Sequence, residues 1–220
     1  DESGGISAAD SSGNGNTGTL TASNASFVAG KINNAVSLTH TGTTSGGLVN
    51  IANPSNFNFD YNQPFSLSAW VYRTSNANEN DIVEKEDPSN GYIGYGILFN
   101  PGSNSLYAEV QKSSSTGIQV STTAGLSTGT WHHVVMTYDG SHVASGLKLY
   151  VDGSSAAFTV NNDTLGPNTI QNTMPLQIGG SGDGDGSTDA GCCTFGGNID
   201  DVRVFNRVLT EADVRVLYGQ

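Results

Sequence analysis

Hydrophobic and polar positions alternate over several stretches of this chain. Apolar residues occupy the odd positions from Phe65 to Val71, while serine or large aromatic residues occupy the even positions. A period of two residues places successive side chains on opposite faces, so this stretch predicts a β-strand with one face in a core. The pattern recurs over residues 133–138 and 147–151, where the following Asp152-Gly153 pair predicts a hairpin turn.

Short apolar stretches separated by turn residues fill most of the remaining chain. Many short strands without helices between them are typical of a two-sheet sandwich. One helix is predicted at the end, where Thr210 and Asp213 form a variant of the capping box ahead of Val214 and Leu217. We therefore expect a single all-β domain over residues 1–220. The further strands are predicted at residues 36–38, 48–51, 82–84, 95–99, 106–111, 118–122, 156–160, 176–178 and 199–205.

Composition and charge narrow the class of protein. Only 35% of the 220 residues are hydrophobic, which fits a turn-rich all-β protein better than a helical one. The net charge of −12 disfavours nucleic acid and anionic membranes as partners, because like charges repel. The same charge either attracts cations or serves solubility. No run of about 18 apolar residues occurs, so we expect no membrane insertion. We also expect that any export signal was removed or lies outside this sequence.

One loop, residues 179–193, concentrates glycine, carboxylates and both cysteines. Its glycines let the backbone turn back on itself, so that Asp183, Asp185 and Asp189 can converge on one point. Such convergence suits a hard cation such as Ca²⁺, whereas the alternative is a solvated acidic loop. A cation held here would have coordination positions left for sugar hydroxyls, so we expect these carboxylates to contact a ligand.

The cysteine pair in this loop has three alternative states. Cys192 and Cys193 either bond to each other, remain free thiols, or bond to another chain. Neighbouring Cα atoms lie about 3.8 Å apart, whereas ordinary disulfides prefer about 4.4 to 6.8 Å, so a bond between them closes a strained and rigid ring. We favour this vicinal bond because the chain has an extracellular character. The ring would present a flat apolar surface to a ligand.

Six blocks in a fixed order resemble a known family. The chain is similar to the laminin-G-like branch of the concanavalin A-like lectin/glucanase superfamily. The resemblance implies a jelly-roll sandwich of two curved antiparallel sheets. It also implies a secreted, modular parent in which such domains bind sugars or serve adhesion, often with Ca²⁺. The blocks are DSSGNGNTG at 10–18, GKINNAVSL at 30–38, FSLSAWV at 65–71, WHHVVMTYDG at 131–140, LKLYVDG at 147–153 and GNIDDVRVFNRVLT at 197–210.

The resemblance further implies a structural calcium that joins the N-terminal loop to the last strand. Carried over to this chain, Asp10 and Asp200 supply carboxylates, and Asn14, Asn16 or backbone carbonyls complete the shell. The alternative is that Asp10 opens an Asx-turn, while Asp200 pairs with Arg203 or binds a backbone amide.

Aromatic side chains offer a second route to sugar binding, because their faces stack on pyranose rings. Tyr92 and Tyr95 are flanked by glycines that we expect to expose them, and Tyr107 is a weaker candidate. Trp70 and Trp131 lie in blocks that the family uses mainly for packing, so we expect both to be structural.

A catalytic spacing also occurs. Glu79, Asp81 and Glu84 match the Glu-x-Asp-x-x-Glu pattern of laminarinase-type glucanases, in which paired carboxylates act as nucleophile and general acid. Asn80 replaces the apolar residue expected there, and the aromatic and glycine surroundings are missing, so we expect no catalysis. No Ser/His/Asp order predicts a triad, and the adjacent His132 and His133 point to opposite faces of a strand.

Together these patterns predict a non-catalytic carbohydrate-binding module with structural calcium, tethered to other domains of a secreted or cell-surface protein. The first alternative is an adhesion or architectural domain that binds a protein or spaces other domains. The second alternative, a glucanase-type glycoside hydrolase, is disfavoured. A glycan is the expected partner.

Overall fold

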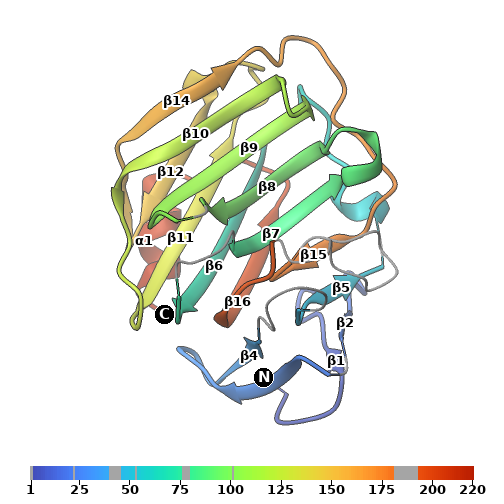
Figure 1. Cartoon of the computed structure of the whole chain (residues 1–220), viewed down its shortest axis with the longest axis vertical. Helices are drawn as coiled ribbons and strands as arrows, with labels where there is room; N and C mark the ends of the chain where they lie inside the picture. Colours follow the sequence, from blue (N-terminus) through green and yellow to red (C-terminus); the bar gives the residue numbers. More distant parts are fainter. Residues whose placement is uncertain are drawn as a thin grey trace.

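The chain folds into two antiparallel β-sheets with one short helix at its C-terminus (Figure 1). The computed structural model describes residues 2–21, 23–39, 46–52, 54–75, 80–100, 102–180 and 193–220. Over these residues the first sheet has nine strands and the second has seven. The predicted jelly-roll sandwich is confirmed, whereas a single domain over the whole chain stays a prediction.

The two sheets are ordered across the fold as follows. The nine-stranded sheet runs β1 (Ser7–Ala8), β2 (Gly18–Leu20), β5 (Val49–Ile51), β15 (Leu176–Ile178), β7 (Asn80–Asp87), β8 (Ile93–Phe99), β9 (Ser105–Ser113), β10 (Thr116–Gly125) and β14 (Phe158–Asp163). The seven-stranded sheet runs β13 (Ser154–Ser155), β12 (Leu147–Val151), β11 (Trp131–Tyr138), β6 (Phe65–Arg73), β16 (Gly197–Phe205), β4 (Asn34–Leu38) and β3 (Ala25–Ala29). Single 3₁₀ turns lie at η1 (Pro54–Phe57), η2 (Pro88–Asn90) and η3 (Ala144–Gly146).

The core lies between the sheets, because both contribute their apolar faces to one cluster. Strand β6 places Phe65, Leu67 and Val71 in it, and strands β8 and β9 add residues such as Ile97 and Val110. Strands β7 to β10 cross in front of β6, β11 and β12 in Figure 1. The alternate residues of these strands face outward, away from this cluster.

Helix α1 (Glu211–Tyr218) covers part of the outer face of the seven-stranded sheet. Its residues Val214 and Leu217 pack with Val135 of β11 and Tyr150 of β12 in a second, smaller cluster. No helix of the described residues is long and apolar enough to cross a membrane.

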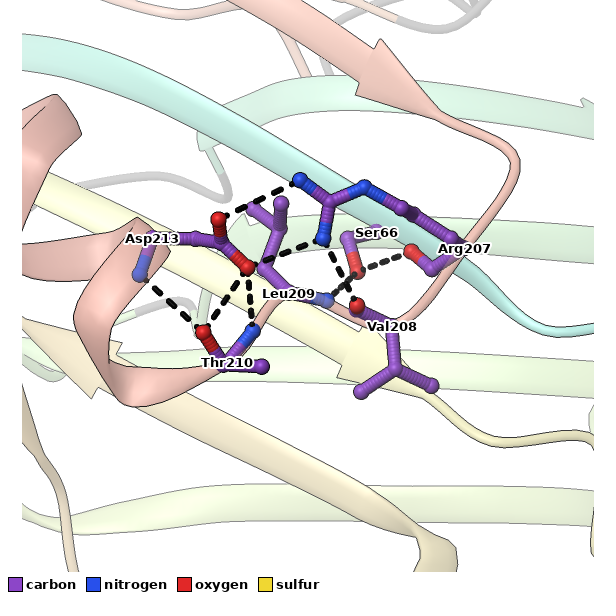
Figure 2. A network of polar contacts seen from close by, with 6 residues as sticks. All are labelled: Ser66, Arg207, Val208, Leu209, Thr210 and Asp213. Atoms are coloured by element: carbon purple, nitrogen blue, oxygen red, sulfur yellow. Dashed lines mark hydrogen bonds and ion pairs between the residues drawn. The ribbon is translucent and has the colours of Figure 1, made fainter.

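The start of α1 is held by the predicted capping box (Figure 2). Thr210 Oγ1 accepts from the Asp213 amide at 3.2 Å, and Asp213 Oδ2 accepts from the Thr210 amide at 2.8 Å. Arg207 donates to both carboxylate oxygens of Asp213, which holds the pKa of that carboxyl below its usual range. Ser66 Oγ of β6 donates to Arg207 O and accepts from Leu209 N, which ties the segment before the helix to the sheet.

Candidate functional site

A row of polar residues and one glycine crosses the nine-stranded sheet on its outer face. Successive members are Cα partners in neighbouring strands, so the row runs perpendicular to the strands from β2 to β14. In the central strands the flanking residues belong to the core: Tyr95 and Ile97 beside Gly96, Ala108 and Val110 beside Glu109, and Ile118 and Val120 beside Gln119. The members of this polar row are Thr19, Asn50, Gln177, Glu84, Gly96, Glu109, Gln119 and Asn162.

The centre of the polar row is closely packed although it faces away from the core. Glu84 has 4% of its surface exposed and Glu109 has 8%. Gln119 Nε2 donates to Glu109 Oε2 at 3.3 Å and to Gln111 Oε1 at 2.9 Å, and Gln111 in turn donates to Glu86 Oε1 at 3.3 Å. Carboxylates and amides that hold one another in this way form a preorganised set of donors and acceptors.

Gly96 leaves a gap in the middle of the polar row. It lies opposite Glu84 of β7 on one side and Glu109 of β9 on the other. A Cβ atom at this position would come within 3.1 Å of Glu84 Cβ. The position between Glu84 and Glu109 therefore has no side chain of its own, and the Glu84 side chain lies close to it.

Two residues of the catalytic-type spacing, Asp81 and Glu84, lie on the same face of the sheet as the polar row. A bulge between Asp81 and Val83 changes the register of β7 against β8, so that Asp81 and Glu84 both turn outward. Glu79 lies outside the described residues. Among the described residues this face carries Asp81, Glu84, Glu86 and Glu109, which are 2 to 8% exposed and whose carboxylate oxygens are hydrogen-bond acceptors.

The candidate tyrosines Tyr92 and Tyr95 differ in their exposure to solvent. Tyr92 follows η2 with 44% of its surface exposed, as expected. The prediction that glycines expose Tyr95 is wrong: it is 1% exposed because its position in β8 points into the core. Tyr95 Oη donates to Phe57 O at 2.8 Å, and burial raises the pKa of this phenol well above its usual range. Tyr95 therefore supports packing and cannot stack on a sugar.

Most of the predicted ligand loop lies outside the described residues. This applies to Asp183, Asp185, Asp189 and Cys192, so their role stays a prediction. Cys193 is disulfide-bonded and buried, with a φ of 73°, and its carbonyl accepts the Asp81 amide at 3.2 Å. The end of the loop is thus attached to the start of β7, beside the acidic outer face. Its pairing with Cys192 also stays a prediction.

The residues predicted to bind calcium line one cavity of about 1110 Å³ between the N-terminal loop and β16. Asp10, Asn14, Asn16 and Asp200 all border it. The sequence thus placed the terminal loop near the last strand correctly. Between β16 and β4 only residues 197–199 are paired, which leaves the second half of β16 along the cavity wall.

Both predicted carboxylates bind backbone amides. Asp10 Oδ1 accepts from Ser12 N and Oδ2 accepts from Asn16 N, each at 2.8 Å, which is an Asx-turn. Asp200 Oδ2 accepts from Ile32 N at 2.8 Å, and burial raises its pKa despite this bond. A carboxylate can accept an amide and bind Ca²⁺ at once, so the two groups fit the ion as partial ligands. Within the described ranges, no three His, Cys, Asp or Glu side chains gather as a metal site.

A Ser/His/Asp chain that the sequence order did not reveal joins the loop before β11 to a hairpin. Ser127 Oγ lies 3.0 Å from His132 Nε2, and His132 Nδ1 lies 2.8 Å from Asp152 Oδ2. Asp152 Oδ1 also accepts the His133 amide at 2.9 Å, so the carboxylate fixes the turn after β12 against the start of β11. Its observed effect is to link these two segments.

The tryptophans pack as predicted. Trp70 is 2% exposed on the outer face of β6, where it stacks on Tyr218 at a centroid distance of 5.5 Å. Lys31 Nζ lies 4.5 Å from the centre of the Trp70 ring. Trp131 contacts Tyr72 with ring centroids 5.7 Å apart. These aromatic residues are engaged with protein groups.

Comparison with known proteins establishes the family. A laminin-G-like family model, described as the concanavalin A-like lectin/glucanases superfamily, matches residues 41–215. The chain belongs to this superfamily. No curated protein matches the present chain significantly in sequence.

Solved structures share the superfamily fold at low sequence identity. The binding domain of Paraclostridial Mosquitocidal Protein 1 is 18% identical with a TM-score of 0.68, and 95% of this chain covers 48% of that one. Domain 4 of AbnA, a GH43 extracellular arabinanase from Geobacillus stearothermophilus, is 20% identical with a TM-score of 0.57, at coverages of 95% and 91%. That domain was solved in complex with arabinotriose. The Trypanosoma rangeli sialidase, in complex with sialic acid, is 17% identical with a TM-score of 0.67, at coverages of 99% and 31%.

This superfamily member thus spans about half the length of the toxin domain and all but a small part of the arabinanase domain. At sequence identities of 17 to 20%, these similarities show a shared fold only. Sequence reasoning missed the polar row, although Gly96, Glu109 and Gln119 alternate with core residues along their strands. The missing information was the register between strands.

Proposed function

We propose that this chain is a non-catalytic carbohydrate-binding module that holds an extended glycan along the polar row. The observation that carries the proposal is the continuous cross-strand register from Thr19 to Asn162. Eight strands at a spacing of about 4.8 Å give a row of about 34 Å, which is long enough for several sugar units. Amides and carboxylates supply both donors and acceptors for sugar hydroxyls.

The neighbourhood of the polar row supports this function. Tyr92 is 44% exposed beyond the β7 end that carries Glu86, and an exposed aromatic ring of this kind can contact a sugar. The carbonyl of Cys193 accepts from the amide of Asp81, so the end of the loop that carries Asp183, Asp185, Asp189 and Cys192 is attached to β7. In our proposal those carboxylates and a Cys192–Cys193 ring form one wall of the glycan site.

The proposal includes a structural Ca²⁺ at Asp10 and Asp200, with Asn14 and Asn16 nearby. It also includes an extracellular location and a tether to other domains. The arabinotriose complex of the arabinanase domain supports sugar binding by this fold. A module of this kind gains affinity mainly from being tethered close to its polysaccharide.

A glycan panel tests the proposal directly. Linear polysaccharides and their oligosaccharides are screened by calorimetry against the wild type and the Glu84→Gln/Glu109→Gln double variant. Glu211→Gln, on the exposed face of α1, is the matched control because it removes a carboxylate on the opposite side of the sandwich. We expect the double variant to lose at least about tenfold in affinity, which corresponds to about 1.4 kcal/mol, and the control to bind normally.

Two outcomes would overturn the proposal. One is silence across the whole panel, which favours the adhesion or architectural alternative. The other is unchanged binding by the double variant, which would place the ligand elsewhere. Because Asp81 and Glu84 share the acidic face, released reducing ends are measured in the same reactions. Sugar release that disappears in Glu84→Gln would make the chain a glycosidase.

A further inference from the structure

Lys85 is a buried lysine without a carboxylate partner among the described residues. Its position in β7 lies opposite Tyr95 of β8, so the side chain points into the sandwich, and only 1% of its surface is exposed. Its Nζ donates to Asn172 O at 2.8 Å and to Asn172 Oδ1 at 2.7 Å. A buried charge is normally paired with an opposite charge, so this environment needs another explanation.

The environment favours the neutral amine. Burial lowers the pKa of Lys85 to about 8, while the charge of Asp87, two residues along β7, acts to raise it. An amine with this pKa is half deprotonated at pH 8, and a deprotonated amine in an apolar surrounding is a nucleophile.

The Asn172 carboxamide is held in one orientation beside this amine. Its Nδ2 donates to Ile93 O at 2.8 Å and to Lys85 O at 3.2 Å, while its Oδ1 accepts from Met174 N at 3.0 Å. Gly94 makes this position accessible, since a Cβ atom there would lie 2.9 Å from Asn172 Nδ2. The oxygen that would gain negative charge under attack thus already faces an N–H donor.

The distance between the reacting groups is short. A carbonyl bond of about 1.23 Å places Asn172 Cγ no further than about 3.9 Å from Lys85 Nζ, given the observed contact to Oδ1. Reactive ground-state geometries bring such atoms to about 3 to 3.5 Å, so attack requires Nζ and Cγ to approach by less than about 1 Å.

We propose that Lys85 and Asn172 join covalently through an isopeptide bond between Nζ and Cγ. The neutral Nζ attacks Cγ, and the carbonyl electron pair moves onto Oδ1 beside the Met174 amide. The Cγ–Nδ2 bond then breaks, one proton passes from Nζ to Nδ2, and nitrogen leaves as ammonia. The step is an acyl transfer, so it needs neither oxidant nor reductant. The bond links β7 to the segment that leads into β15, 87 residues away in sequence.

Intact mass spectrometry of the reduced wild type tests the proposal. We expect a mass about 17 Da below that of the sequence, and a proteolytic peptide that contains both Lys85 and Asn172. The Lys85→Arg variant keeps the charge and the donors, but its guanidinium stays protonated and is no nucleophile, so it should have the full mass.

A wild type of full mass would overturn the proposal if its Lys85 and Asn172 peptides remain separate after long incubation at about pH 9, where the amine is mostly neutral. This measurement needs no variant to fold. A mass loss that persists in Lys85→Arg would equally overturn it, since the ammonia would then come from another residue.

Discussion

Glu84 and Glu109 lie on opposite sides of Gly96 in one row of the nine-stranded sheet, each the Cα partner of that glycine. The glycine therefore separates two nearly buried carboxylates on strands that are not themselves adjacent. In the proposed function this gap lies in the middle of the glycan path. Three of the predictions below concern the stability of the sandwich, and the first concerns this gap.

Filling the gap should block binding. A Gly96→Leu variant places a Cβ within 3.1 Å of Glu84 Cβ and a larger group beyond it, so we expect at least a tenfold loss of glycan affinity by calorimetry. Gly4→Leu is the matched control, because open space surrounds Gly4 and its substitution should leave affinity unchanged. Normal binding by a folded Gly96→Leu protein would place the ligand away from the polar row.

Calcium should stabilise the wild type. Burial raises the pKa of Asp200, so a cation beside it should favour the charged carboxylate, and we expect the Tm to rise in millimolar Ca²⁺ and to fall again with chelator. Asp10→Asn and Asp200→Asn should each remove most of this rise, whereas Glu211→Gln should keep it. A Tm that does not change with calcium would contradict the predicted site. A calcium-induced rise in Tm that persists in the Asp10→Asn/Asp200→Asn double variant would also contradict it.

Acid should weaken the fold through His133. Burial lowers the pKa of His133 to about 4 from its ordinary 6.5, mainly because its ring is enclosed beside Ser68 and Trp70. Between these pH values the unfolded chain binds more protons, so stability falls as the pH drops from 6.5 to 4, by up to about 3 kcal/mol.

Urea unfolding over this pH range measures the effect. His133→Phe removes the titrating group, so the variant should lose less stability on acidification than the wild type, although it also loses the 3.0 Å contact with Ser68 Oγ at neutral pH. Parallel pH profiles for the two proteins would show that His133 does not cause the acid sensitivity.

The helix cap should contribute measurably to stability. Thr210→Ala removes the side chain that accepts the Asp213 amide, so we expect the free energy of unfolding to fall by about 1 kcal/mol in urea titrations. Thr210→Ser retains the hydroxyl and should unfold like the wild type. Equal stability of Thr210→Ala and wild type would mean that packing of Val214 and Leu217 alone holds α1.

The sequence predicted the long central strands well, because alternation is a local signal. Strand β6 and the helix cap at Thr210 appear where the pattern places them. The short strands β1 and β3 were missed, since few of their residues are buried and turn residues surround them. Strand β14 begins two residues later than predicted, and its Val160 is exposed because the strand lies at the edge of the sheet.

The predictions for the candidate site also differ in how well they agree with the structure. Asp10 and Asp200 were expected to approach each other and do line one cavity, which follows from the resemblance of the terminal blocks to the family. The prediction that Tyr95 is exposed was wrong, since flanking glycines do not determine which face of a strand a residue occupies. The role of Asp183, Asp185, Asp189 and Cys192 stays a prediction, because these residues lie outside the part of the chain that the structure describes.

The sequence by itself determined which residues face inward along the long alternating strands such as β6 and therefore determined the sandwich, because alternation of apolar and polar side chains is a local signal. Only the tertiary structure decided which outward residues are neighbours. The polar row collects residues from Thr19 to Gln177, and Lys85 meets Asn172 from 87 positions away. Such pairs depend on strand order and register, which result from closing long loops around a shared core, and no local pattern encodes them.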